Sequence, residues 1–289
     1  MKKIFIYSII LTLLNSCNNK ENSENKNLLG NDYALFKNTP LAQLANALET
    51  GDSLKINTEA TKKNVNLNFQ EPKFGSTLLM LSIRNRQFEN VELLLKLAAN
   101  PNVVDTYRGE TAVITAAKIP ESKYLDIILR YKGNPNSIEN LATKEGDEAR
   151  RSALTSAIGP LDNSSLEKVK LLVNAGANID YRVEGHTDTA LSEALTNEKM
   201  DLVLYLLQKG ANINQYIYKT VNGREVYILR ALRTCVFDLD SKEFNQKLEV
   251  IKLLKSKGLD YNKEPIPDYI LKEIKEKYPE DWENIIKSY

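Results

Sequence analysis

The sequence contains little of the residue chemistry on which most active sites depend. It has one histidine, His186, and two cysteines, Cys17 and Cys235, in 289 residues. One imidazole and one available thiolate cannot supply the four ligands of a structural zinc site. Two cysteines are also too few for the disulfide framework of a small secreted domain. His186 stands in a polar stretch without a Gly-x-Ser-x-Gly nucleophile motif, so we interpret it as a solvated loop residue. Cys235 has apolar neighbours and is expected to be a buried small side chain.

The sequence also lacks an excess of charge of either sign. Lys and Arg number 39 against 38 for Asp and Glu, which gives a net charge of +1. No global field therefore favours nucleic acid or an anionic membrane surface. The glycines form no phosphate-binding pattern. We expect no metal, no cofactor, no small-molecule substrate and no nucleic-acid partner, and the residue inventory argues against an enzyme.

The first hydrophobic run is too short to cross a membrane. Two lysines precede apolar residues from Ile4 to Leu14, a length typical of a signal peptide, whereas a bilayer needs roughly 20 apolar residues. The run ends in Leu14-Asn15-Ser16-Cys17, which resembles a bacterial lipobox. This resemblance implies removal of residues 1–16, a lipid on the sulfur of Cys17, and acylation of the new N-terminus. An uncleaved anchor with an incidental cysteine is the alternative.

Residues 17–39 are expected to form a tether behind the lipidated cysteine. Residues 18–27 read NNKENSENKN and contain no apolar side chain, so this segment cannot bury surface and is predicted to be disordered. Two or more acyl chains anchor a protein stably in a membrane. Asn18 is not the aspartate that retains lipoproteins in the inner membrane of enteric bacteria. We therefore expect a lipid-anchored envelope protein with its body in the periplasm, and the outer membrane is favoured.

A short asparagine-rich phrase recurs along the rest of the chain. The copies are Lys63–Asn66, Ala99–Asn102, Gly133–Asn136, Gly176–Asp180, Gly210–Asn214 and Gly258–Asn262, so their last residues are 36, 34, 44, 34 and 48 positions apart. Apolar residues at helical spacing precede each phrase. Glycine after such a helix supplies a left-handed cap. A shorter helix starts ahead of it at a hydroxyl residue that can cap its N-terminus, such as Thr77, Thr111, Ser152 or Thr189.

Helix, turn, helix, Gly-Ala-Asn-Ile-Asn and a projecting loop together resemble the ankyrin repeat family over residues 41–262. The resemblance implies an all-α solenoid of about six repeats over residues 40–262, with residues 263–289 as a capping helix segment containing Trp282. The Thr-Pro-Leu-His signature of the family lacks its proline and histidine here, so the hydrogen bonds of that histidine between repeats are in doubt. A non-repetitive helical bundle is the alternative.

Two repeats are enlarged, and insertions in repeat proteins map to loops that often bind partners. They contain residues 137–151 and 215–227, and Asn222-Gly223 in the second predicts a β-hairpin. Tyr and Arg dominate protein–protein hot spots. The residues predicted to contact a partner are Tyr107, Arg108, Glu139, Arg150, Tyr181, Arg182, Glu184, Tyr216, Tyr218 and Arg224. For any single tyrosine, packing against the next loop is the alternative.

A narrower resemblance rests on the order of features along the chain. A lipid signal is followed by GSTLLMLSI at residues 75–83, GREVYIL at residues 223–229 and an extended turn before KGLD at residues 257–260. This order is similar to that of ankyrin-type periplasmic immunity proteins encoded beside type VI secretion effectors, especially lipases. It implies a non-catalytic protein that binds and neutralises a secreted toxin. A generic envelope scaffold that recruits a resident periplasmic or outer-membrane protein is the alternative.

Overall fold

The computed structural model describes residues 28–140, 150–159, 162–182 and 189–288. The predicted signal peptide, residues 17–27 of the predicted tether with Cys17, Glu184 and His186 lie outside these ranges. The prediction of a tether up to residue 39 is corrected, because Tyr33, Leu35 and Phe36 are buried in the folded body.

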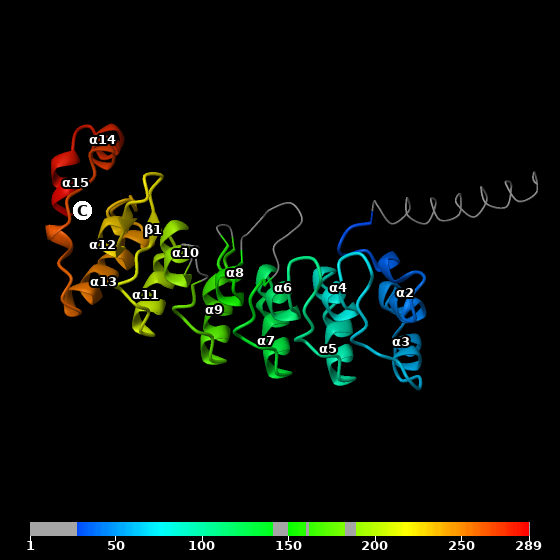
Figure 1. Ribbon diagram of the computed structural model, residues 1–289. Helices are drawn as coiled ribbons and strands as arrows, with labels where there is room; N and C mark the ends of the chain where they lie inside the picture. Colours follow the sequence, from blue (N-terminus) through cyan, green and yellow to red (C-terminus); the bar gives the residue numbers. More distant parts are fainter. Residues whose placement is uncertain (1–27, 141–149, 160–161, 183–188, 289) are drawn as a thin grey trace, which may run out of the picture.

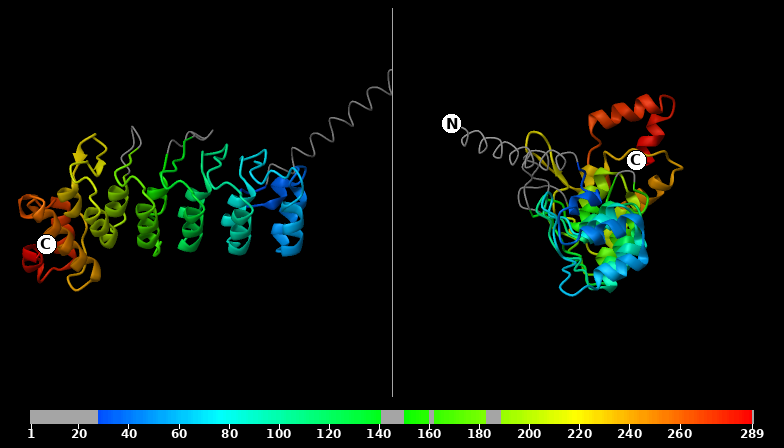
Figure 2. Two further views of the ribbon diagram at one scale, coloured as in Figure 1. Left: turned by 90° about the horizontal axis from the view of Figure 1, so that it is seen from below. Right: turned by 90° about the vertical axis from the view of Figure 1, so that its right-hand side faces the viewer.

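The described residues form six helix pairs stacked side by side in a row (Figure 1). The pairs are α2 (Ala42–Thr50) with α3 (Ser53–Ala60), α4 (Leu78–Arg84) with α5 (Phe88–Lys96), α6 (Ala112–Lys118) with α7 (Ser122–Arg130), α8 (Ala153–Ser156) with α9 (Ser165–Asn174), α10 (Ala190–Thr196) with α11 (Met200–Gln208), and α12 (Ile228–Leu232) with α13 (Lys242–Ser256). The loops that join one pair to the next, here called fingers, project from one side of the row (Figure 2). The expected helical solenoid is therefore confirmed.

The helices bury one continuous apolar core that runs along the row. It extends from Tyr33 in the short 3-10 helix η2 (Tyr33–Phe36) to Tyr261 in the 3-10 helix η3 (Tyr261–Lys263). Helices such as α7 and α11 direct Leu and Ile at helical spacing into it, and no pair can cover that face alone. Cys235 is buried, as expected.

Three of the four expected hydroxyl caps are present at the start of a first helix. Thr77 accepts a hydrogen bond from the Met80 N–H, and Ser152 and Thr189 each form a reciprocal capping box. Thr111 is the exception, because its hydroxyl caps no N–H and is buried without a hydrogen-bond partner.

The left-handed position after the second helix is not always glycine. Gly176 and Gly210 occupy it with φ of 94° and 92°, but Lys132 and Ala98 occupy it in two other repeats with φ of 65° and 66°. The expectation that Gly133 supplies this cap is corrected, because the preceding residue, Lys132, does so.

The asparagine phrases form a ladder of hydrogen bonds that joins neighbouring repeats. The side-chain oxygen of the last residue of each phrase accepts the backbone N–H of the next phrase: Asn68 from Asn100 and Asn102 from Asn134 at 2.7 Å, Asn136 from Asn178 at 2.7 Å, and Asp180 from Asn212 at 2.8 Å. The first phrase therefore ends at Asn68 and not at Asn66. The spacing to Asn102 becomes 34 residues in place of 36.

The second enlarged finger contains the expected hairpin. Strand β1 (Tyr218–Lys219) pairs antiparallel with β2 (Glu225–Val226), with Tyr218 opposite Val226. Gly223 has φ of 77° in the turn, a conformation that suits glycine. In the first enlarged finger, an isolated bridge joins Ile138 to Ser152 and so closes the base of the inserted loop.

The C-terminal segment forms two helices rather than one capping helix. Helices α14 (Asp268–Lys277) and α15 (Trp282–Ser288) stand away from the line of the row, beyond α12 and α13 (Figures 1 and 2). Ile270, Ile274 and Ile285 form a separate apolar cluster with Phe244 of α13, and Trp282 packs against that cluster half-buried.

We predict that Asn136→Ala lowers the free energy of unfolding by about 1–3 kcal/mol, because it removes two hydrogen bonds between repeats. The Asn136 side chain accepts the Asn178 N–H and donates to the Gly176 carbonyl at 3.1 Å. Asn214→Ala is the matched control, since that side chain makes no hydrogen bond within the described residues and should shift stability by less than about 0.5 kcal/mol. Urea denaturation measures both, and equal losses would contradict the ladder.

Candidate protein-binding surface

Neighbouring fingers approach each other closely because two glycines leave room for backbone. A Cβ on Gly75 would lie 2.5 Å from the Thr106 backbone nitrogen, and one on Gly109 would lie 2.6 Å from that of Asn140. The Thr106 N–H donates to the Phe74 carbonyl at 3.0 Å. The fingers therefore form a stacked row and not a set of independent loops.

A buried carboxylate organises the base of three successive fingers. Glu71, Asp105 and Glu139 are spaced 34 residues apart and each is 1–3% exposed. Glu71 accepts backbone N–H groups of residues 73, 74 and 76, and Asp105 accepts those of residues 107 to 110. A carboxylate can be buried when several N–H groups donate to it, because its oxygens then keep hydrogen-bond partners. The finger backbones are thus folded around these three acids.

Cations from the first helices connect these carboxylates across repeats. The Arg84 Nη2 at the end of α4 lies 3.7 Å from both Asp105 Oδ2 and Glu110 Oε2. The Lys118 Nζ at the end of α6 pairs with Glu110 and, at 2.6 Å, with Glu139 Oε1. Arg84 and Lys118 are again 34 residues apart. Each cation therefore bridges its own repeat to the following finger.

The same arrangement continues into the first enlarged finger. Glu139 also lies 3.6 Å from Arg108 Nη2, and its Oε2 accepts the Arg151 backbone N–H at 3.2 Å. The Arg151 guanidinium reaches Glu193 of α10, with Nη2 2.6 Å from Oε1. A chain of ion pairs, continued between Glu139 and Arg151 by a backbone hydrogen bond, thus runs from α4 to α10 along the finger bases. We call the cations Arg84, Arg108, Lys118 and Arg151 the cation row.

The predicted contact residues on the earlier fingers separate into surface and interior positions. Tyr107 is 40% exposed and packs edge-on against the Phe74 ring of the preceding finger at 5.6 Å. Arg150 is exposed. The prediction that Glu139 contacts a partner is corrected. Its carboxylate is buried and pairs with Lys118, Arg108 and the Arg151 backbone N–H, so it is not exposed to a partner. The sequence does contain a signal for this interior role, because Glu71, Asp105 and Glu139 recur at the 34-residue spacing of the repeats.

The predicted contact residues on the later fingers also touch one another. The Arg182 guanidinium stacks over the Tyr216 ring at 4.1 Å and donates to the Tyr216 carbonyl at 2.5 Å. Tyr181 is half-buried, as are Arg182, Tyr216 and Tyr218. Arg224 is exposed in the hairpin turn. Tyr107 and Tyr216 therefore pack against neighbouring fingers, as the alternative interpretation proposed, although neither is fully buried. Arg224 is exposed at the surface.

Two pockets meet at Tyr218 near the C-terminal end of the finger row. One, of about 420 Å³, is lined by Leu195, Thr196, Glu198, Ile217, Tyr218, Ala231, Thr234 and Cys235. The other, of about 230 Å³, lies between the hairpin and α14 and is lined by Tyr218, Thr220, Arg224, Glu225, Val226, Tyr227, Arg230, Glu264 and Tyr269. Tyr227 and Tyr269 are 46% and 61% exposed. Sequence reasoning missed both tyrosines, because only the fold brings α14 beside the hairpin.

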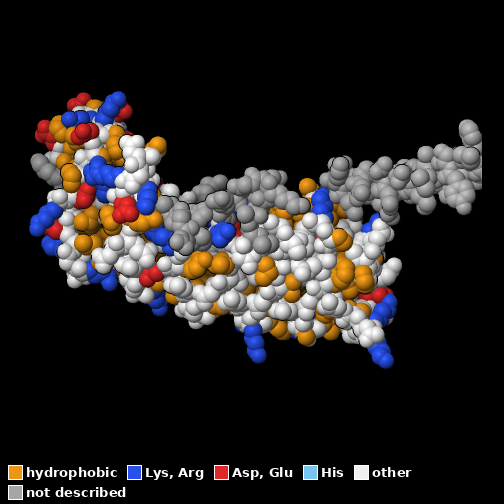
Figure 3. All heavy atoms as spheres, viewed as in Figure 1, with side chains coloured by type: hydrophobic (Ala, Val, Ile, Leu, Met, Phe, Trp, Pro, Cys, Tyr) orange, Lys and Arg blue, Asp and Glu red, His pale blue; other side chains and the backbone are white. Residues whose placement is uncertain are grey.

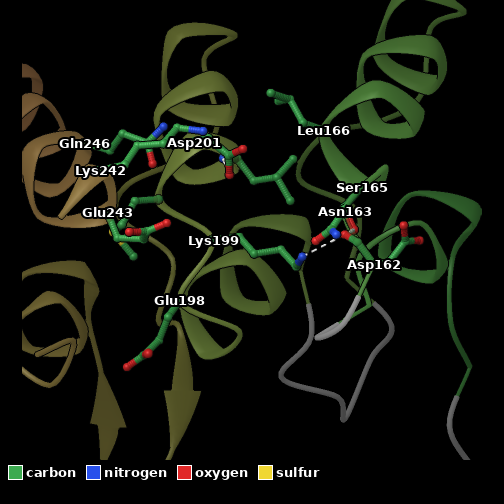
Figure 4. Close-up of a pocket in the computed structure, with 12 residues that line it drawn as sticks. Asp162, Asn163, Ser165, Leu166, Glu198, Lys199, Asp201, Lys242, Glu243 and Gln246 are labelled. Carbon is green, nitrogen blue, oxygen red and sulfur yellow. Dashed lines mark hydrogen bonds between the residues drawn. The ribbon is translucent and has the colours of Figure 1, made fainter. Parts of the chain in front are cut away.

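A third pocket, of about 360 Å³, lies at the opposite ends of the helices, along the turns between paired helices (Figure 4). Glu198 and Lys199 from one turn, Asp162 from the preceding turn and Lys242 from α13 are among the residues that line it. The Lys199 Nζ donates to the Asp162 carbonyl at 2.8 Å. Its wall is polar and carries both acidic and basic side chains.

Beneath the C-terminal pockets, a buried lysine holds the last repeat together. The Lys247 Nζ of α13 donates to the Cys235 carbonyl at 2.9 Å, and the Lys247 side chain is almost completely buried. Burial lowers the pKa of Lys247 to about 7 and raises the pKa of the Cys235 thiol to about 12. The neighbouring Arg233 donates to the Tyr261 and Glu264 carbonyls at 2.9 and 3.0 Å.

Within the described part of the chain, no group of three or more His, Cys, Asp or Glu residues could hold a metal ion. No helix in the same ranges combines the length and apolar character needed to cross a membrane.

Comparison with known proteins identifies the repeats. A family model for three copies of the ankyrin repeat matches residues 125–217, and a model for a single ankyrin repeat matches residues 74–106. A crystal structure of an ankyrin repeat protein superposes with a TM-score of 0.52 at 20% sequence identity, covering 74% of this chain and 97% of that one. The chain therefore contains ankyrin repeats and has the fold of an ankyrin-repeat solenoid.

Curated relatives match only part of their own length. The chain is 31% identical over 143 residues to the nuclear factor NF-kappa-B p105 subunit of Gallus gallus, covering 49% of this chain and 14% of that protein. It is 28% identical over 144 residues to a putative ankyrin repeat protein of Rickettsia felis, covering 49% and 43%. The chain thus spans less than half of each relative. Ankyrin repeats imply a protein-binding role, and these matches add nothing finer.

We predict that stability increases between pH 7 and pH 9 because of Lys247. Its pKa of about 7 in the folded state lies below its ordinary value of 10.5, so over this range the unfolded chain binds more protons. The free energy of unfolding should rise by up to about 2 kcal/mol. Above pH 9 the effect weakens, since ionisation of the Cys235 thiol in the unfolded chain opposes it.

Lys247→Met is the test, because it keeps the aliphatic stem and removes the titrating amine. Urea unfolding at pH 7, 8 and 9 should give a flatter profile for the variant than for the wild type. Parallel profiles would contradict the assignment of this pH dependence to Lys247.

Proposed function

We propose that this ankyrin-repeat chain is a non-catalytic binding protein, tethered to the cell envelope by a lipid on Cys17, that neutralises a periplasm-acting type VI secretion effector. The observation that carries the binding role is the stacked finger row, whose loops are held in place by hydrogen bonds and ion pairs between repeats. A surface ordered before binding loses little conformational freedom when a partner docks.

The immunity role rests on the sequence and its chemistry. The lipobox-like Leu14–Cys17 and the order of motifs support an exported protein that meets incoming effectors. Neutralisation requires only that the effector's active site be covered, which an ordered row of fingers with exposed side chains can do without catalysis. Tight neutralisation needs about −12 kcal/mol of binding free energy, equivalent to nanomolar affinity. Lipase effectors are the first class to test.

We predict that the full chain rescues bacteria that produce its cognate effector in the periplasm. The effector to test is the one encoded beside this gene. Tyr227→Ala combined with Tyr269→Ala should weaken effector binding by about 10-fold or more, since exposed aromatic side chains that line a pocket are typical hot-spot residues. Leu54→Ala is the control, because that side chain is 83% exposed on α3 and lies away from the fingers.

Rescue assays and calorimetric titration measure these effects. Failure of the wild type to rescue or to bind the effector would refute the immunity role. Capture of a resident envelope protein in that case would instead support a scaffold that recruits it.

A separate prediction concerns the tether. Cys17→Ser should move the protein from the membrane fraction to the soluble periplasmic fraction, because the thiol that carries the lipid is gone. Cys235→Ser is the matched control and should remain in the membrane fraction, since Cys235 is buried between repeats. Fractionation and metabolic labelling with palmitate distinguish the two. Palmitate incorporation into Cys17→Ser at the level of the wild type would exclude lipidation at this residue.

A further inference from the structure

The hairpin β1–β2 is the last finger of the row. Its β1 side faces the preceding finger, since Arg182 stacks over the Tyr216 ring and donates to the Tyr216 carbonyl. Its β2 side has no following finger within the described residues, because the chain continues from η3 into α14. A Cβ on Gly223 would meet no atom within 4 Å, whereas one on Gly75 or Gly109 would collide with the backbone of the next finger. The outer edge of β2 is therefore not covered by another finger.

The pairing of the two strands shows that backbone groups of β2 point outward at this edge. The Thr220 N–H donates to the Arg224 carbonyl at 2.9 Å, and Lys219 lies opposite Glu225. Hydrogen-bonded and non-hydrogen-bonded pairs alternate along an antiparallel ladder, so Lys219 and Glu225 form a non-hydrogen-bonded pair. The Glu225 N–H and C=O therefore point away from β1, and the described residues supply no hydrogen-bond partner for them. An edge with unpaired backbone groups is a template for a further strand.

This edge borders the pocket of about 230 Å³ between the hairpin and α14, which lie beside each other in Figure 1. Glu225 and Val226 line the pocket from the hairpin, and Tyr269 lines it from α14. Tyr227 and Tyr269 are both exposed there. Figure 3 shows hydrophobic, basic and acidic side chains together at the surface over this end of the row. A segment bound in the pocket would cover aromatic surface and also reach the outward backbone groups of β2.

Arg224 gives this pocket one positive charge without a partner. The cations of the cation row are each paired with a carboxylate. Beside the pocket, Glu225 pairs with Lys219 at 3.5 Å and Arg230 with Glu264 at 3.7 Å. Arg224 is exposed, and only its backbone N–H and carbonyl form hydrogen bonds within the described residues. A free guanidinium favours a carboxylate, which it can bind through two parallel hydrogen bonds.

We infer that β2 accepts an extended segment of a protein partner, which adds to the hairpin as a third strand beside α14 and places a carboxylate against Arg224. This inference rests on the proposed protein-binding function and specifies the conformation and the charge of the bound segment. Strand addition takes its affinity from main-chain hydrogen bonds and its specificity from side-chain contacts. A helical segment satisfies its own backbone groups, so it could not use the outward N–H and C=O of Glu225.

The probe is a fluorescein-labelled peptide of about six residues, the usual length of a strand, in which threonine and valine alternate and one residue is aspartate. Fluorescence anisotropy measures its binding to the full chain. N-methylation of one of the two alternate sets of peptide amides should weaken binding by about 10-fold, because it removes the donors that face β2, and methylation of the other set by less than about 2-fold. Absence of probe binding, or equal affinity of the two methylated forms, would overturn the inference.

A pair of proline variants locates the binding edge. Glu225→Pro removes the outward N–H of β2, and the matched control Lys219→Pro removes that of β1. Both variants lose the Lys219–Glu225 ion pair and keep the residues of the Thr220–Arg224 hydrogen bond. Proline is tolerated on an edge strand where the missing N–H faced outward. Glu225→Pro should weaken probe binding by about 10-fold and Lys219→Pro by less than about 2-fold, and equal weakening would contradict binding at β2.

Arg224→Gln tests the charge of the segment. It should weaken binding of the aspartate probe by about 3-fold and leave binding of a probe with asparagine at the same position unchanged, as expected for one exposed ion pair. Equal affinity of the two probes for the wild type would refute the acidic part of the inference. Thermal melts establish that each variant is folded.

Two further measurements distinguish the occupants of the edge. A dimer of the full chain in analytical ultracentrifugation that Glu225→Pro abolishes would assign the edge to a second copy and overturn the inference. Effector binding should slow hydrogen exchange of the Glu225 N–H. Effector binding without this protection would refute the inference and leave the proposed function intact. Probe binding at β2 without effector binding would refute the immunity role alone.

Discussion

The structure depends on one interaction that is repeated along the row, the acceptance of a backbone N–H by the asparagine or aspartate of the preceding repeat. Four such bonds of 2.7 to 2.8 Å join Asn68, Asn102, Asn136 and Asp180 to the phrases that follow them. Each bond fixes the distance between neighbouring fingers. Apolar burial holds the helices together, but it is not directional, so the ladder sets the register.

The ladder also explains how a repeat can be enlarged without disturbing its neighbours. The spacing between Asn136 and Asp180 is 44 residues, yet Asn136 still accepts the Asn178 N–H. A bridge joins Ile138 to Ser152 at the base of the insertion. The ladder therefore bypasses the insertion, while Glu139 and Arg151 at its base remain tied to the stack by ion pairs and a hydrogen bond.

Sequence periodicity predicted the helix pairs, the phrases and the hairpin, because each depends on local patterns of apolar residues, glycine and asparagine. It could not show which polar side chains turn inward. Glu139 looked like a loop residue on the surface, yet it lies beneath Lys118 and Arg108, which come from other segments. The missing family histidine put one set of hydrogen bonds between repeats in doubt, although apolar packing still links the repeats. Ion pairs between repeats supply a second link, which only the three-dimensional arrangement reveals.

The ladder ends at Asn214, and the repeat that follows is held together by other contacts. The next phrase, Gly258–Asn262, follows the long helix α13, and the Asn214 side chain makes no hydrogen bond to it within the described residues. Buried cations stabilise the last repeat from within, because Lys247 donates to the Cys235 carbonyl and Arg233 donates to the Tyr261 carbonyl. A buried amine whose pKa falls to about 7 is a costly means of attachment, because burial disfavours its charged form. The two pockets that meet at Tyr218 lie in this same region. The loss of the ladder, the buried cations and the two pockets therefore coincide at the C-terminal end of the row.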